Sequence, residues 1–107
     1  EIKNWTEELE DLNEELEYFL DIEDRMLNNS SLYQQLHDVR RENTLLLGVL
    51  YRYEGTIGNA IECDTTECDA YYLNHHEKKR NTYLAHIKNY RALKTRILSQ
   101  ILLKAKG

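Results

Sequence analysis

The fold is decided by residues 32–60, which read LYQQLHDVRRENTLLLGVLYRYEGTIGNA. Apolar side chains recur here at alternating steps of four and three residues for almost four heptads, the spacing that lines one face of an α-helix. Further leucines and a valine in the middle widen this face, so we expect the helix to have neighbours on more than one side. The heptad positions are Leu32, Leu36, Val39, Asn43, Leu46, Leu50, Tyr53, Ile57 and Ala60.

Similar stripes flank this stretch on both sides. The chain has no proline and only four glycines, so little interrupts a long helix. Short polar residues at 28–31 and the segment 61–66 break the periodicity and indicate two connections. The first stripe is Ile2, Trp5, Leu9, Leu12, Leu16 and Phe19, and the third is Leu73, Tyr83, Ile87, Tyr90, Leu93, Ile97 and Ile101.

Together the three stripes predict an all-α fold, an antiparallel, coiled-coil-like three-helix bundle with an extended third helix. The expected helices cover about residues 2–27, 31–59 and 67–105. At 107 residues we expect one domain. Because the chain starts at Glu1 and not at methionine, and ends at Gly107, we expect it to be a piece of a longer protein.

Charge is distributed unevenly along the sequence. Residues 1–27 hold 11 acidic and two basic side chains, a net charge of −9. Residues 67–107 hold three acidic and nine basic side chains, a net charge of +6. Opposite charges favour neighbouring positions, so we expect the first and third helices to lie side by side.

The length of the third helix leads to the main functional hypothesis. At 1.5 Å per residue it reaches roughly 58 Å, against roughly 40 Å for the other two. We expect residues after about 93 to extend past the other helices and to expose an apolar end. A second copy, as in a homodimer, or another protein would cover that end. The expected interface residues are Ile97, Leu98, Ile101 and Leu102, together with Asn43, whose place in the heptad core is typical of a residue that fixes register and oligomer state.

Two other binding functions remain open. A monomeric adaptor would bind an acidic partner protein through aromatic and basic side chains early in the third helix, namely Tyr71, Tyr72, Lys78, Lys79 and Arg80. Nucleic-acid binding is the least favoured function, because the basic run is short and acidic side chains surround it.

Several functions are not expected. No nucleophile, base and orienting residue share a pattern, so the sequence predicts neither an enzyme nor a cofactor site. Cys63 and Cys68 are separated by four residues and do not match zinc spacing with His75 and His76. We expect free thiols and an intracellular, cytoplasmic location. The longest apolar run, Leu45 to Tyr51, is too short to cross a membrane.

Overall fold

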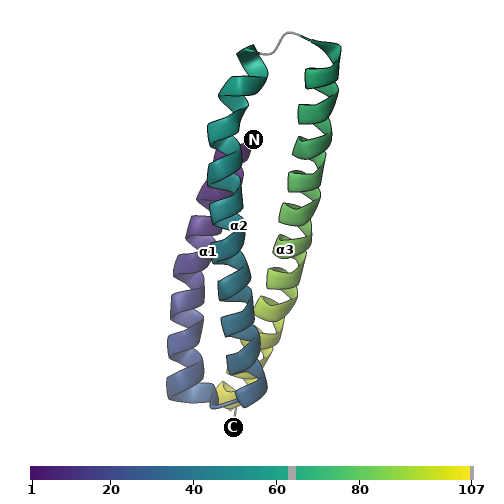
Figure 1. Ribbon diagram of the computed structural model, residues 1–107. Helices are drawn as coiled ribbons and strands as arrows, with labels where there is room; N and C mark the ends of the chain where they lie inside the picture. Colours follow the sequence, from purple (N-terminus) through teal and green to yellow (C-terminus); the bar gives the residue numbers. More distant parts are fainter. Residues whose placement is uncertain (63–64, 107) are drawn as a thin grey trace.

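The computed structural model describes the backbone of residues 1–62 and 65–106 and the side chains of all of these except 57–62. Three helices pack lengthwise, and the expected all-α three-helix bundle is confirmed (Figure 1). Helix α1 spans Ile2–Ile22 and continues into a π-helical segment, η1, at Glu23–Leu27. Helix α2 spans Ser30–Glu62 and α3 spans Thr66–Lys106.

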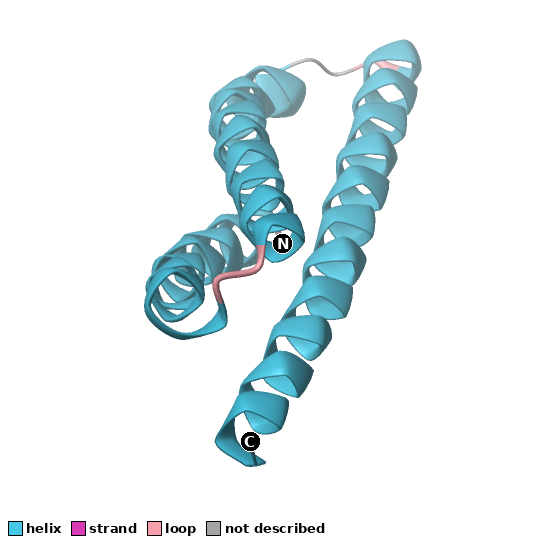
Figure 2. Ribbon diagram, turned by 90° about the horizontal axis from the view of Figure 1, so that it is seen from below, coloured by secondary structure: helices cyan, strands magenta, loops and turns pink. Residues whose placement is uncertain are grey.

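The helices alternate in direction, and their register follows from the contacts between them. Tyr53 meets His76, and Gln35 meets Arg96, so α2 runs antiparallel to α3. Glu15 meets Lys94, and the start of α1 meets the first half of α3, so these two helices run parallel. Seen from one end, the helices do not lie in a single layer (Figure 2).

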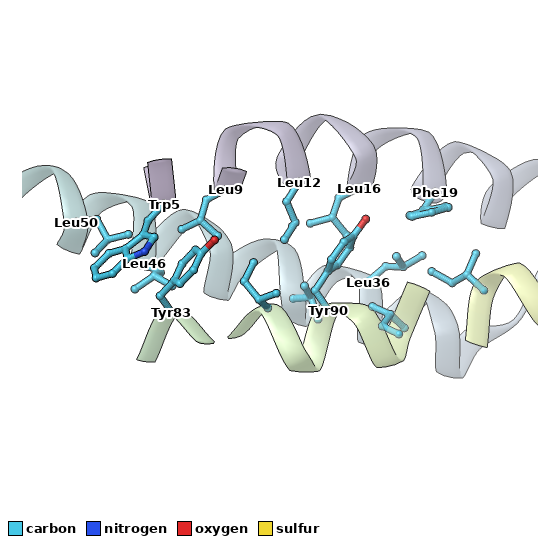
Figure 3. Close-up of a cluster of buried hydrophobic side chains, with 14 of the residues drawn as sticks. Trp5, Leu9, Leu12, Leu16, Phe19, Leu36, Leu46, Leu50, Tyr83 and Tyr90 are labelled. Atoms are coloured by element: carbon cyan, nitrogen blue, oxygen red, sulfur yellow. The ribbon is translucent and has the colours of Figure 1, made fainter. Parts of the chain in front are cut away.

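The heptad stripes form the core. The positions of the first stripe from Ile2 to Phe19 are buried, as are those of α2 from Leu32 to Tyr53. Met26, which continues the first repeat seven residues after Phe19, is 40% exposed. Ile57 and Ala60 lie outside the described side chains. In α3 the buried stripe runs from Tyr83 to Ile97 (Figure 3). Leu73 is the exception: it is 65% exposed, so its expected place in the core is wrong.

A tight turn joins α1 to α2. Asn28 has φ of 46°, in the left-handed region that asparagine tolerates better than most residues. Its amide donates to the carbonyl of Glu23, 2.8 Å away. The buried carboxylate of Glu23 accepts the amide of Asn29, and the Asn29 side chain accepts the amides of Ser31 and Leu32. The turn therefore caps both helix ends that it connects.

The bundle has three helices over only part of its length. The carboxylate of Glu1 contacts His76 and Arg80. Helix α1 therefore begins beside residues 76–80 of α3 and not beside the start of α3 at Thr66. Beyond that level α2 and α3 continue without a third helix (Figure 1). Leu73 precedes His76 by about one helical turn and so lies in this two-helix stretch, which explains its exposure.

Candidate functional site

Asn43 connects all three helices from the centre of the core. Its side-chain amide donates to the carbonyl of Leu9 in α1 at 2.9 Å. Its side-chain oxygen lies 2.8 Å from Nε2 of His86 in α3. Asn43 is 0% exposed, so it contacts only its own chain. Its expected place in an interface between copies is therefore wrong, whereas its hydrogen bonds are of the kind that fix helix register.

These bonds also define the protonation of His86. Because the Asn43 oxygen can only accept, His86 Nε2 carries the proton and donates. The second ring nitrogen, Nδ1, lies 4.0 Å from the carboxylate of Glu42. Burial lowers the pKa of His86 below its usual 6.5, and the Glu42 carboxylate opposes this only in part. The buried imidazole is therefore neutral near pH 7.

Tyrosines join α3 to the acidic helix α1. The hydroxyl of Tyr83 donates to the carboxylate of Glu8, and that of Tyr90 donates to Glu15. Burial and these carboxylates raise the pKa of both tyrosines well above the usual range, so the hydroxyls stay protonated. Glu15 also pairs with Lys94 at 2.8 Å. The sequence carries a signal for these contacts, because Glu8 and Glu15 are seven residues apart, as are Tyr83 and Tyr90. The uneven charge alone predicted that the two helices are neighbours.

The apolar end of α3 is covered more fully than expected. Ile97 is 0% exposed, and Ile101 packs partly buried against the core. Arg96 donates to Gln35 at 2.7 Å, near the start of α2. The expected extension past the other helices is therefore wrong at Ile97 and Ile101. What remains is an end patch, which we define as the exposed leucines Leu98, Leu102 and Leu103.

The residues expected to bind an acidic partner do not gather into one patch. Tyr71 is 58% exposed, and its ring contacts those of Tyr72 and His75. Lys79 lies over the ring of Tyr53, with 5.7 Å from Nζ to the ring centre.

The rest of the basic run is divided in the same way. Arg80 pairs with Glu1 at 2.7 Å. Lys78 is exposed and, within the described part of the chain, has no ion pair. Lys79 and Arg80 therefore already have partners within the same chain.

A groove runs along the outside of the bundle between α2 and α3. It has a volume of about 460 Å³ and is mostly apolar. This groove was not expected from the sequence, because the apolar face that includes Leu45 and Val49 was predicted to contact neighbouring helices of the bundle. Leu45 is 64% exposed at its edge. We call this groove the α2/α3 valley; its lining residues are Glu42, Leu45, Leu46, Val49, Lys79, Thr82, Ala85 and His86.

The cysteine at the start of α3 differs from expectation. Cys68 is disulfide-bonded, so the prediction of a free thiol there is wrong. Cys63, the other cysteine of the sequence, lies outside the described residues. Disulfides persist mainly in oxidising compartments, so the thiol argument for an intracellular location no longer holds.

Two further observations concern metals and membranes. Among the described residues, no three His, Cys, Asp or Glu side chains are placed to ligate one metal ion. Within the same part of the chain, no helix combines the length and hydropathy that crossing a bilayer requires.

Comparison of the chain with protein-family models, with curated proteins and with solved structures found no match.

Proposed function

We propose that this chain is a protein-interaction module that self-associates by helix packing and so acts as an oligomerisation scaffold. The observation that carries the proposal is the exposure of large leucines on a bundle whose core is already complete. Leu45, Leu84 and Leu102 are each more than half exposed, although the stripes of α1 from Ile2 to Phe19, of α2 from Leu32 to Tyr53 and of α3 from Tyr83 to Ile97 are buried. Exposed apolar surface of this kind, grouped in places, is typical of a contact site.

Two surfaces can serve this function. The first is the end patch, the remaining part of the surface expected at the end of α3. The second is the α2/α3 valley, where an apolar groove lies open along two helices. Three leucines form a small contact, whereas a groove between two helices accepts a further helix along its length.

The adaptor function is supported less well. Its strongest support is the exposed ring of Tyr71. An acidic partner would have to compete with Glu1 for Arg80, and Lys79 is already held over Tyr53. Nucleic-acid binding faces the same competition, since a phosphate backbone needs a continuous positive surface.

The solution mass tests the proposal. Size-exclusion chromatography with light scattering, over a range of protein concentrations, is expected to give a mass that rises from 12.8 kDa to twice that value. The apolar contribution to association responds weakly to salt, so the dimer is expected to persist at moderate ionic strength. A mass that stays at one chain across the whole range would contradict self-association.

A further inference from the structure

We infer that Asn28, in the turn between α1 and α2, is the acceptor of an N-linked glycan in a chain that folds in an oxidising compartment. This inference goes beyond the proposed function, because it concerns a covalent modification and not a contact with another chain. It rests on the sequence of the turn, on the exposure of its side chains and on the disulfide of Cys68.

The turn contains an acceptor sequence for N-linked glycans. Asn28 is followed by Asn29 and Ser30, and asparagine followed two residues later by serine or threonine, with no proline between them, is the glycosylation tripeptide, or sequon. Two further sequons begin at Asn4 and Asn29. Such tripeptides also occur by chance, so their places in the fold have to distinguish them.

The sequon that begins at Asn28 is open to solvent. The side chains of Asn28 and Ser30 are both exposed, and neither forms a hydrogen bond with a residue that the structure describes. Asn28 lies where the helical backbone is interrupted, with φ of 46°, and the turn lies at one end of the bundle (Figure 1). A hydrated oligosaccharide attached at this exposed turn displaces no packed side chain.

The other two sequons are each partly enclosed by the fold. Asn29 is only partly exposed, and its side-chain oxygen accepts two backbone amides at the start of α2. Asn4 is exposed, but Thr6, the hydroxyl residue of its sequon, is buried and donates to a backbone carbonyl of α1 at 3.0 Å. Only the sequon at Asn28 therefore has both its asparagine and its hydroxyl residue exposed.

The disulfide of Cys68 is an independent observation that points to the compartment in which glycans are added. Disulfides persist in the lumen of the endoplasmic reticulum and in secreted proteins, whereas cytosolic thiols are kept reduced. N-linked glycans are transferred in the same lumen. Cys68 and the turn lie at opposite ends of the bundle, so neither feature depends on the other (Figure 1).

The modification transfers a glycan to the side-chain nitrogen, Nδ2, of Asn28. The donor is an oligosaccharide joined through a diphosphate to a polyisoprenoid lipid. A bond forms between Nδ2 and the anomeric carbon of the first sugar, while the bond from that carbon to the phosphate oxygen breaks. The lipid diphosphate leaves with the electron pair, and the nitrogen gives one proton to a base of the transferase. No atom is oxidised or reduced, and the amide keeps its oxygen and one N–H group.

Two neighbouring serines provide matched variants. Ser30→Ala removes the sequon at Asn28 and keeps the one at Asn29, whereas Ser31→Ala does the reverse. Both serines are exposed, so both variants are expected to fold, which far-UV circular dichroism verifies.

Each chain is produced with a secretion signal in animal cells and treated with an amidase that converts glycosylated asparagine to aspartate. Mass spectrometry of the peptides then measures this conversion at position 28. The conversion is expected in the wild type and in Ser31→Ala, and its complete loss is expected in Ser30→Ala.

The protein isolated from the cells that make it tests the compartment. Position 28 is expected to carry the glycan there as well, and Cys68 is expected to resist alkylation until a reductant is added. An unmodified Asn28 in either preparation overturns the inference, as does a glycan at the turn that is lost with Ser31→Ala and kept with Ser30→Ala. Self-association is decided separately, by the solution mass of the chain, so failure of this inference leaves the proposed function standing.

Discussion

At the scale of single residues, the molecule depends on a polar group inside an apolar core. Asn43 satisfies both of its hydrogen-bonding ends through Leu9 and His86, on two different helices. A shift of α3 by one heptad that brought Leu93 to the place of His86 would leave the side-chain oxygen of Asn43 without its donor, which is costly in a core. The residue therefore favours one alignment of α2 with α3.

Removing the Asn43 side chain is expected to destabilise the bundle. Asn43→Ala deletes two buried hydrogen bonds, leaves the His86 donor unpaired and creates a cavity, so the free energy of unfolding should fall by about 2–4 kcal/mol. Urea denaturation followed by circular dichroism measures this change. Asn81→Ala, at an exposed position of α3, is the control and should change stability by less than about 0.5 kcal/mol. A loss for Asn43→Ala as small as that of the control would contradict the structural role.

The same contact makes stability depend on pH. Burial lowers the pKa of His86 in the folded chain, so on acidification the unfolded chain takes up the proton first. The free energy of unfolding is therefore expected to fall as the pH drops below about 6.5, and to level off below the folded pKa. The charged group facing His86 from α2 is Glu42, and α1 contributes the Leu9 carbonyl through Asn43.

His86→Gln isolates this contribution, because its amide can donate to Asn43 but does not titrate. Denaturation curves at pH 7.5 and pH 5 should differ less for this variant than for the wild type. Equal pH dependence in the two proteins would assign the effect to other groups.

At the scale of the elements, the helices and their approximate bounds were predictable, and their positions relative to one another were not. The heptad stripe from Leu32 to Tyr53 is buried as expected, because its period depends only on local geometry. Leu73 was expected in the core and is exposed, and Ile97 was expected to be exposed and is buried. Both depend on where α1 begins and ends beside α3. That register is set by contacts distant in sequence, such as Glu1 with Arg80, which periodicity does not contain.

The exposed apolar surface was the least predictable part, for a related reason. Leu45 belongs to the apolar face that the sequence assigned to helix neighbours. Three helices leave one side of α2 open, so the side chain that a fourth helix would cover lies in solvent. The residue types can be read from the sequence, but the packing of the helices decides which of them remain exposed.

The turn between α1 and α2 permits a prediction about an element boundary. Asn28 occupies the left-handed region with φ of 46°, where a Cβ costs energy and glycine does not. Asn28→Gly is expected to leave the thermal midpoint unchanged or slightly higher. Asn28→Val, with a branched Cβ, is expected to lower stability by about 1–2 kcal/mol. Thermal denaturation distinguishes these results, and similar midpoints for both variants would contradict the strained geometry.

At the scale of the whole molecule, charge and apolar surface serve different purposes. The acidic and basic helices lie side by side and are joined by Glu15 with Lys94 and Glu1 with Arg80. Pairs this exposed contribute little to stability, so burial of the core stripes supplies most of it. Because these pairs lie within one chain, the exposed apolar side chains are the surface that the proposed self-association would use.

The unequal helix lengths also determine the order in which the molecule comes apart. Where α1 is missing, α2 and α3 each have one neighbour instead of two, and so less contact holds them. Local opening is therefore expected to start at this end and to proceed towards the level of Asn43, where three helices are in contact. Cys68 lies in the first turn of α3, within this weakly packed end, so its covalent bond acts where side-chain packing contributes least.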